Sequence, residues 1–184
     1  MSEAPRFRLE PLGPQHDRRH FSCGNAALDR YLREQAGQDQ RRHLARCFLL
    51  IALDTGQPAG YFTLSAYAIA PADLPAEERR GLPAYDLVPA VLIGRLALDR
   101  ALQGVSLTPT GTPRVTIASV LLHEALAACL TLAGRLGLRV VVVDAKDARA
   151  IRFYQRHGFL AFHDRPDRPY LPIATIARLP GMTA

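Results

Sequence analysis

The feature that most constrains the fold is a continuous apolar run late in the chain. Residues 138–145 read LRVVVVDA, with four consecutive valines. A strand with one covered face alternates apolar and polar residues, whereas an unbroken apolar run is typical of a strand buried on both faces. Such strands occur in parallel sheets that carry helices on both sides. The run therefore predicts an inner strand of an α/β fold.

Helical patterns flank this strand. Residues 115–136 are apolar almost throughout, and Gly137 follows where a helix end favours glycine. After the strand, Asp144 is predicted to cap a second helix, with the acidic Asp147 in its first turn. This second helix is expected to stop at Gly158. The sequence thus predicts a helix, a buried strand and a helix in succession.

The rest of the chain predicts further strands around one more helix. Asn25 is suited to cap that helix, because apolar residues recur after it at helical spacing. Strands are expected at residues 7–12, 47–53, 60–70, 91–99, 159–164 and 170–179. Residues 71–89 and 101–114 are dense in Pro, Gly or charge and are predicted to be irregular. The order indicates one α/β domain over residues 1–184, with a mixed sheet flanked by helices.

Length and hydropathy suit this single domain. The chain has 184 residues, 48% of them hydrophobic, and domains of about 100 to 150 residues are the commonest size. A membrane-spanning helix needs roughly 18 apolar residues in succession. The segment that comes nearest, residues 115–134, is interrupted by His123 and Glu124. The first ten residues lack the apolar core of a secretory signal. We therefore expect a cytoplasmic protein without membrane contact.

The cysteines and histidines do not predict a metal centre. Cys23, Cys47 and Cys129 lack C-x-x-C spacing, and an odd number cannot form a closed disulfide framework. His16 and His20 lie four residues apart without a further ligand nearby in the sequence. We expect reduced, structural cysteines and no bound metal.

The charge is strongly positive and almost entirely due to arginine. The formal net charge is +6, the isoelectric point is about 9.7, and Lys146 is the only lysine. A basic protein attracts polyanions, and the planar guanidinium suits phosphate. The same excess is expected from a GC-rich genome. Charge alone therefore leaves both explanations open.

Several motifs together resemble the GNAT superfamily of acyl-CoA N-acyltransferases. VLIGRLALDRALQG (91–104) is similar to the fourth strand of that fold, and DAKDARAIRFYQRHGF (144–159) resembles its last helix with the pattern A-x-x-F-Y-x-x-x-G-F. FSCGNAALDRYLREQAGQDQ (21–40) resembles the C-G-x-x-x-L-D-x-Y-L signature of type II toxins paired with ribbon-helix-helix (DUF1778-like) antitoxins. AGYFTLSAYAI (59–69) resembles their second hairpin. The similarity spans about residues 7 to 180.

This resemblance implies a function. Such toxins transfer acetyl from acetyl-CoA to the α-amine of aminoacyl-tRNA and so block translation. The resemblance also implies a ribbon-helix-helix antitoxin, contact with operator DNA only through the antitoxin complex, and a homodimer. Acetylation of a small amine or a protein N-terminus, or a non-catalytic domain that binds an antitoxin, are the alternatives.

The resemblance also places acetyl-CoA. Two parallel strands splay apart in this fold, so that backbone groups can pair with the pantetheine arm, while free N–H groups at a helix N-terminus attract the pyrophosphate. The expected Q/R-x-x-G-x-G/A pattern is interrupted here, because ten residues, 105–114, follow Gly104, and Thr116 stands where glycine is usual. A loop that no longer binds CoA is therefore an alternative. The predicted cofactor-binding residues are Leu96, Ala97, Leu98, Arg114, Val115, Thr116, Ile117, Ala118 and Ser119.

Tyr154 is the predicted catalytic residue. In the resembling family the tyrosine of the F-Y pair is the general acid that protonates the departing CoA thiolate. The alternative is an aromatic that only packs the helix onto the sheet. No general base is evident. An α-amine, with a pKa of about 7.7–8.0, needs less help than a lysine at about 10.4, although a base acting through water, such as Glu77, Glu78 or Asp99, stays open.

Four arginines are predicted to contact tRNA phosphates: Arg41, Arg42, Arg46 and Arg95. Arg79 and Arg80 are further candidates. The pair Arg41 and Arg42 follows a polar helix end and is equally compatible with a solvated face. Arg95 alternates with apolar residues on its strand, so that an ion pair on the sheet surface is its alternative role.

Overall fold

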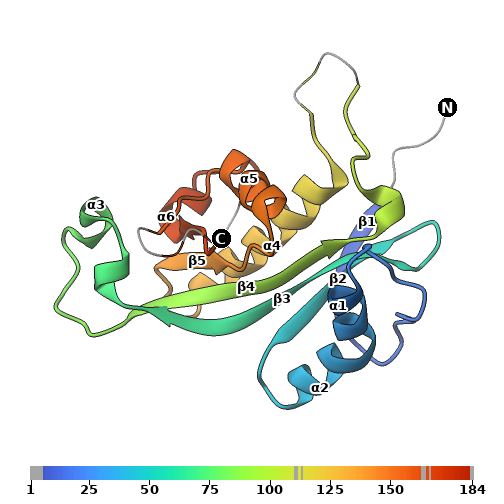
Figure 1. The fold of residues 1–184 in the computed structure, drawn as a ribbon, viewed down its shortest axis with the longest axis horizontal. Coiled ribbons are helices and arrows are strands. Elements are labelled where there is room, and N and C mark those ends of the chain that lie inside the picture. Colours follow the sequence, from blue (N-terminus) through green and yellow to red (C-terminus); the bar gives the residue numbers. More distant parts are fainter. Residues whose placement is uncertain (1–5, 110–111, 113, 163–164, 166, 183–184) are drawn as a thin grey trace. The chain divides into compact units, whose positions relative to one another are not determined.

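The computed structural model describes residues 6–109, 112, 114–162, 165 and 167–182. It contains a six-stranded sheet in the order β1-β2-β3-β4-β5-β6 (Figure 1). The strands are β1 (Phe7–Pro11), β2 (Arg46–Ala52), β3 (Pro58–Ile69), β4 (Val88–Leu98), β5 (Val140–Val143) and β6 (Tyr170–Pro172). The pairs β1–β2, β2–β3 and β5–β6 are antiparallel, whereas β4 and β5 are parallel. The predicted mixed α/β fold is confirmed.

Helical segments connect these strands. They are α1 (Ala26–Arg30), the π-helix η1 (Tyr31–Gln35), α2 (Ala36–Arg41), the 3₁₀ turn η2 (Pro71–Asp73), α3 (Ala76–Arg79), the 3₁₀ turn η3 (Arg100–Leu102), α4 (Ile117–Ala133), α5 (Ala148–Arg156) and α6 (Ile173–Ile176). Within the part of the chain that the structure describes, no helix has the length and hydropathy needed to span a bilayer.

Two compact units make up the chain. The first comprises residues 1–64 and 95–125, and the second comprises residues 65–94 and 126–184. Strands β3 and β4 and helix α4 each contribute residues to both units.

The first unit has a helix layer on each face of its part of the sheet. On one face, side chains of the strands are buried against α1, η1 and α2. This cluster contains Leu12, Phe21, Tyr31, Leu32, Ala36, Cys47, Leu49, Ile51, Tyr61 and Ala97. On the opposite face, the start of α4 lies so close that a Cβ on Gly60 would be 3.0 Å from Leu121 Cδ2.

The N-terminal helical segment begins as predicted. The Asn25 side chain accepts hydrogen bonds from the N–H groups of Ala27 and Leu28. The apolar spacing did not predict the π-helical turn that follows α1. Inside this turn the carbonyl of Leu32 accepts a hydrogen bond of 2.9 Å from Arg18 Nη1. A π-helical turn widens the hydrogen-bond ring and is common at functional sites.

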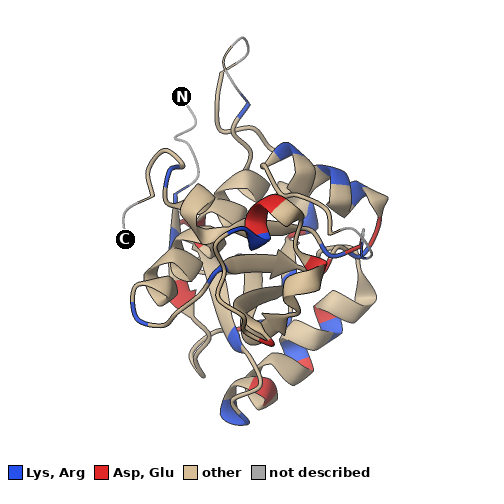
Figure 2. Ribbon diagram, turned by 90° about the vertical axis from the view of Figure 1, so that its left-hand side faces the viewer, with Lys and Arg blue, Asp and Glu red and all other residues tan. Residues whose placement is uncertain are grey.

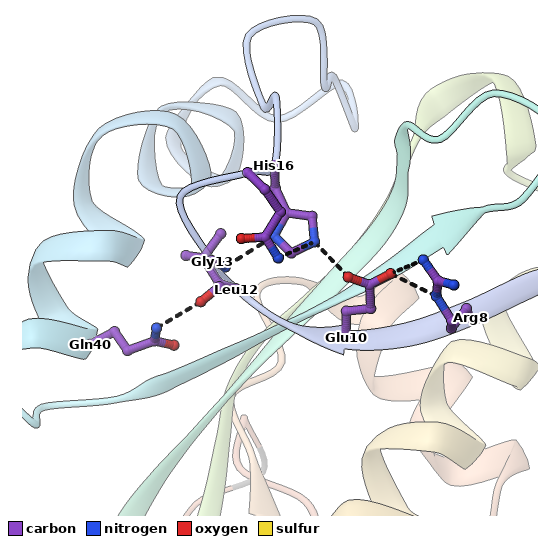
Figure 3. Close-up of polar contacts among 7 residues, drawn as sticks. Arg8, Glu10, Leu12, Gly13, His16 and Gln40 are labelled. Carbon is purple, nitrogen blue, oxygen red and sulfur yellow. Dashed lines mark hydrogen bonds and ion pairs between the residues drawn. The ribbon is translucent and has the colours of Figure 1, made fainter.

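Polar side chains fix the turn that leaves β1 (Figure 3). His16 Nδ1 accepts from the Gly13 N–H at 3.0 Å, and its Nε2 lies 2.9 Å from Glu10 Oε2. Gln40 Nε2 donates to the Leu12 carbonyl at 2.8 Å. His16, which the sequence did not predict as a metal ligand, thus has a structural role in this turn.

The second unit contains β5, the strand with four consecutive valines. All four valines of β5 are buried, as an inner strand requires. The parallel pairing runs from Ala90 opposite Val140 to Ile93 opposite Val143. One face of this unit is filled by Ile69, Leu74, Val88, Ala90, Val140, Val142, Phe162 and Tyr170.

Helix α4 is shorter than predicted at both ends. It runs from Ile117 to Ala133, whereas the apolar run suggested 115–136. The side-chain hydroxyl of Thr116 accepts the Ser119 N–H at 3.1 Å, so Thr116 caps the helix instead of joining it. At the other end the helix stops before Gly134, which has low helix propensity.

Three further predictions near the C-terminus were wrong. Asp147, not Asp144, caps α5, since its side chain accepts the Ala150 N–H at 2.8 Å. The second closing strand ends at Pro172, and α6 follows instead of more strand, because a short apolar run fits either structure. The first closing strand, predicted over 159–164, is reduced to an isolated bridge between Leu160 and Tyr170. Residues 163 and 164 lie outside the described residues.

All three cysteines are free. Cys47 and Cys129 are buried, and burial raises the pKa of both thiols to about 12. They behave as the small core residues that the sequence predicted.

We expect Gly60→Ala to destabilise the protein by roughly 1–3 kcal/mol, because overpacking forces the neighbours apart. The added methyl group would lie 2.9 Å from the Ala97 carbonyl oxygen. Urea unfolding measures the free energy. Gly137→Ala is the matched control, since no atom lies within 4 Å of its Cβ position. Equal stability of the two variants would contradict the packing of α4 on β3.

Candidate functional site

The end of β4 has a free backbone edge. β5 pairs with β4 only over Ala90–Ile93, whereas β4 continues to Leu98. The Asp99 N–H donates to the Ala59 carbonyl of β3 at 2.8 Å. Because backbone groups alternate in direction along a strand, those of Leu96 and Leu98 point away from β3. Two of the predicted cofactor residues thus present the backbone groups that pairing with an amide-containing ligand needs, whereas Ala97 directs its own towards β3.

A polar clamp holds this end of β4. Gln103 Nε2 donates to the Leu98 carbonyl at 3.1 Å and to the Cys23 carbonyl at 2.8 Å. The Arg100 N–H donates to the Ser22 carbonyl at 2.8 Å. The loop at 22–25 and the end of β4 are therefore joined by both side-chain and backbone bonds.

Asp29 fixes the loop that takes part in this clamp. Its side chain is only 6% exposed. Asp29 Oδ1 accepts the Cys23 N–H at 2.7 Å, and Oδ2 accepts the Ser22 hydroxyl at 3.1 Å. Gly24 has a φ of +83°, which favours glycine. Cys23, Gly24 and Asp29 belong to the motif noted in the sequence, so the motif encodes this loop.

The charge state of Asp29 follows from these contacts. Burial acts to raise the pKa of the carboxyl group. The hydrogen bonds from Cys23 and Ser22 and the nearby charge of Arg33 outweigh burial, so the pKa lies below its ordinary value. Asp29 is therefore ionised at neutral pH and accepts both hydrogen bonds as a carboxylate.

A reciprocal cap closes the N-terminus of α4. The Thr116 hydroxyl accepts the Ser119 N–H at 3.1 Å, and the Ser119 hydroxyl accepts the Thr116 N–H at 2.9 Å. The same arrangement with Glu or Gln as the second residue is known as a capping box. This explains physically why threonine stands where the family pattern has glycine.

Further N–H groups of the predicted phosphate site are also engaged. The Val115 N–H donates to the Thr108 hydroxyl at 3.1 Å, and the Ile117 N–H donates to the Val105 carbonyl at 3.3 Å. The Ala118 N–H has no acceptor among the described residues. Arg114 is exposed and donates to the Gly104 carbonyl at 2.6 Å. An anion at this helix end would find one free amide, two hydroxyls and one guanidinium.

Tyr154 lies on α5 in the second unit. Its ring is 4% exposed and contacts Phe153 and Phe159, with ring centroids 5.4 Å and 5.3 Å away. Its hydroxyl has no hydrogen-bond partner among the described residues. Burial, with a smaller contribution from the charge of Asp144, raises the pKa of Tyr154. The phenol therefore stays protonated at neutral pH and has a proton to donate.

Two of the three carboxylates considered as bases have structural partners. Asp99 accepts the N–H groups of Ser22 and Ala101. Glu78 lies 3.5 Å from Arg139 Nη2. Asp144 forms an ion pair of 2.8 Å with Arg168 instead of capping α5. Glu77 lies exposed in α3.

The predicted tRNA-contacting arginines lie in the first unit. Arg41 and Arg42 lie at the end of α2, Arg46 begins β2, and all three are exposed. Arg95 is different, because its guanidinium lies 3.5 Å from the centre of the Tyr31 ring. This cation–π contact replaces the ion pair considered from the sequence. Most charged residues of the chain lie on helices and loops (Figure 2).

The sequence did not predict Arg18 as part of this surface. A Cβ on Gly37 would lie 3.4 Å from Arg41 Nη1 and 3.8 Å from Arg18 Nη1. The two guanidinium groups thus flank the bare backbone of one glycine. No carboxylate among the described residues forms an ion pair with either. Arg18 lies outside any helix, and no spacing rule links it to Arg41.

Comparison with known proteins decides the family. No family model matches the chain. A tRNA-acetylating toxin of Mycobacterium tuberculosis is 35% identical over 139 residues, which cover 76% of this chain and 75% of the relative. The chain belongs to the family of tRNA-acetylating toxins. A probable toxin TacT of Sinorhizobium fredii is 28% identical over 181 residues, 94% of each protein.

Solved structures of toxins in this family share the fold. AtaT in complex with acetyl-methionyl-tRNAfMet has a TM-score of 0.80 and 26% identity, covering 93% of this chain and 97% of AtaT. A tyrosine-to-phenylalanine mutant of KacT has a TM-score of 0.80 and 24% identity, covering 94% and 98%. AtaTR bound with acetyl-CoA has a TM-score of 0.74. The GNAT fold expected from the motifs is confirmed.

Other AtaT structures contain macromolecular partners. One holds the C-terminus of the antitoxin AtaR together with acetyl-CoA, and another holds the AtaT–AtaR complex on DNA, with TM-scores of 0.72 and 0.69. Both are 23% identical to this chain, so they establish only the shared fold.

We expect Asp29→Asn to destabilise the protein by about 1–3 kcal/mol at neutral pH, because one buried donor loses its acceptor. The folded-state pKa of Asp29 is lowered. The carboxylate therefore stabilises the fold fully above its unfolded pKa of about 3.9 and loses this effect as the pH falls below that value. The difference in unfolding free energy between wild type and variant should shrink from pH 6 to pH 3 in urea titrations.

The control for this titration is Asp86→Asn, which removes an exposed carboxylate. Its stability should stay within about 0.5 kcal/mol of wild type. A pH-independent difference between wild type and Asp29→Asn would refute the assigned role of the Asp29 charge.

Proposed function

We propose that this protein transfers the acetyl group of acetyl-CoA to the α-amine of an aminoacyl-tRNA and thereby blocks translation. The observation that carries the proposal is the 35% identity with a tRNA-acetylating toxin over three quarters of both chains. The similarity to AtaT, which was solved with acetyl-methionyl-tRNAfMet and with acetyl-CoA, supports it.

Backbone groups of β4 align the acetyl donor in this proposal. Leu96 and Leu98 direct their N–H and C=O groups to the free edge, where the amides of the pantetheine arm extend the sheet, and Ala97 keeps both residues in register. A backbone N–H at this edge polarises the thioester carbonyl, and such donors typically lower a barrier by about 2.7–4 kcal/mol.

The region Arg114–Ser119 binds the phosphates. Arg114 supplies a planar guanidinium, Ala118 supplies an unpaired N–H, and the Thr116 and Ser119 hydroxyls supply further donors once they exchange partners. Val115 and Ile117 set the course of the backbone, and the buried Ile117 side chain anchors it to the core.

Tyr154 acts as the general acid. The neutral acceptor amine forms a bond to the acetyl carbon, the carbon–sulfur bond breaks, and Tyr154 gives its proton to the departing thiolate. The proton that the nitrogen loses as the amide forms passes to water, and water returns a proton to the Tyr154 phenolate. The raised pKa and the free hydroxyl of Tyr154 suit this role. Substitution of tyrosine by phenylalanine is also the change carried by the solved KacT chain.

The proposal extends to partners and location. The structures of AtaT with AtaR and DNA support an antitoxin partner and DNA contact through the complex. We propose an antitoxin of the ribbon-helix-helix class, a homodimer, one GNAT domain comprising both compact units, and a cytoplasmic location, where charged tRNA is found.

We expect Tyr154→Phe to lower kcat for acetyl transfer by about 10²–10⁴-fold, because proton transfer by a positioned acid contributes this much. The assay follows labelled acetyl from acetyl-CoA onto charged and uncharged tRNA. Label on charged tRNA alone, lost in the variant, is the expected result. Absence of label with every charged tRNA would refute the proposed function.

Tyr170→Phe is the matched control for Tyr154→Phe. Tyr170 is fully buried in the same unit, and its hydroxyl has no partner among the described residues. Tyr170→Phe removes a tyrosine hydroxyl, as Tyr154→Phe does, but breaks no hydrogen bond to a described residue. We therefore expect kcat to stay within twofold of wild type, which corresponds to roughly 0.4 kcal/mol in the activation barrier. Equal losses in both variants would point to packing and not to proton transfer.

Arginines of the first unit bind the tRNA backbone in this proposal. Arg41, Arg42 and Arg46 are exposed. Arg18 belongs to the same group, because its guanidinium and that of Arg41 both lie beside Gly37. A phosphate that binds both guanidinium groups would lie beside Gly37, which has no side chain to obstruct it. Arg95 contributes charge from its position over Tyr31.

We expect the double variant Arg18→Ala/Arg41→Ala to raise KM for aminoacyl-tRNA and to reduce the slope of log K against log salt by about two, roughly one for each lost phosphate contact. The KM for acetyl-CoA should not change. Arg8→Ala, which removes an exposed arginine paired with Glu10, is the control. An unchanged salt slope in the double variant would rule out this phosphate contact.

A further inference from the structure

Gln103 occupies an unusual position at the end of the cofactor strand. Its side chain is exposed, yet one amide nitrogen donates to two backbone carbonyls from distant parts of the sequence, those of Leu98 and Cys23. Both partners are acceptors, so the amide nitrogen and not the amide oxygen faces them. Two donated hydrogen bonds hold the side chain in one conformation.

The Leu98 carbonyl is one of two acceptors on the free edge of β4. The other is the Leu96 carbonyl, which points to the same side. Gln103 already supplies one donor to Leu98. Leu96 has no hydrogen-bond partner away from β3 among the described residues. Each carbonyl oxygen has two lone pairs that can accept a hydrogen bond. A ligand amide that pairs with this edge therefore finds both lone pairs free on the Leu96 oxygen and only one free on the Leu98 oxygen.

The second anchor of Gln103 is itself held in place. The Cys23 carbonyl belongs to the loop whose N–H at Cys23 and hydroxyl at Ser22 both bind Asp29. The Ser22 N–H also donates to Asp99 at 3.3 Å, one residue after Leu98. Gln103 thus connects a loop held by several hydrogen bonds to the end of β4.

We propose that Gln103 is a positioning residue for the acetyl donor: by holding the Leu98 carbonyl, it fixes the end of β4 and so sets the register in which the pantetheine arm pairs with Leu96 and Leu98. This inference rests on the proposed function, since it requires acetyl-CoA to pair with β4. It adds a residue that acts through the backbone and does not touch the reacting atoms.

The test compares two ligands on the full chain by isothermal titration calorimetry. Acetyl-CoA contains the pantetheine arm, whereas 3′-phosphoadenosine 5′-diphosphate is the nucleotide half of CoA without it. Gln103→Leu should raise the Kd of acetyl-CoA about tenfold, a factor that corresponds to a small number of hydrogen bonds, and leave the Kd of the nucleotide within twofold. Gln103→Glu, which keeps the shape but loses the donor, should show the same difference.

Gln38→Leu is the matched control. Gln38 is exposed in the same unit and donates one side-chain hydrogen bond to a backbone carbonyl, that of Glu34. It should bind both ligands as the wild type does. Steady-state kinetics add a second readout: the Gln103 variants should raise KM for acetyl-CoA and leave KM for aminoacyl-tRNA unchanged.

Each other outcome is decisive. Equal weakening of both ligands would show that Gln103 only supports the loop, and unchanged affinity for both would show that it does not position the donor. Either result, with acetyl transfer by the wild type intact, overturns this inference and leaves the proposed function standing. A wild type that binds no acetyl-CoA would overturn both.

Discussion

The structure depends on an unequal pairing of one strand. β4 pairs with β5 in parallel over Ala90–Ile93 only, although β4 continues to Leu98. Unpaired backbone groups at a strand edge attract another extended segment. In the proposed function that segment is the donor of the acetyl group, so the same strand serves as core in one half and as binding edge in the other.

An exposed edge of this kind needs support that does not cover it. The loop at 22–25, the Asp29 carboxylate and Gln103 provide this support from the end of the strand. These contacts explain why the motif at residues 21–40 occurs together with the strand β4, which is distant from it in the sequence. The motif does not itself contain the predicted chemistry; it fixes the backbone that does.

Regular elements with strong patterns could be predicted from the sequence. The four valines of β5 and the Asn25 cap are such cases, because burial on both faces and a capping side chain leave clear local signals. The ends of α4 and the N-cap of α5 could not be placed, whereas the predicted end of α5 at Gly158 is confirmed. Thr116 caps α4 and Asp147 caps α5 through local hydrogen bonds that several neighbouring residues could form equally well. Asp144 does not cap α5 because it pairs with Arg168, which is distant in the sequence. Arg18 and Gln103 were missed for the same reason, since their partners lie 14, 5 and 80 residues away.

The insertion that interrupts the family pattern closes on itself. The Leu107 N–H donates to the Val115 carbonyl at 2.7 Å, and Ser106 pairs with Thr116 across an antiparallel bridge. Its two ends therefore meet before α4 begins, and the position of the helix does not depend on how many residues lie between them. Since loop closure costs grow only slowly with length, related chains can gain or lose residues between these two ends while α4 keeps its place.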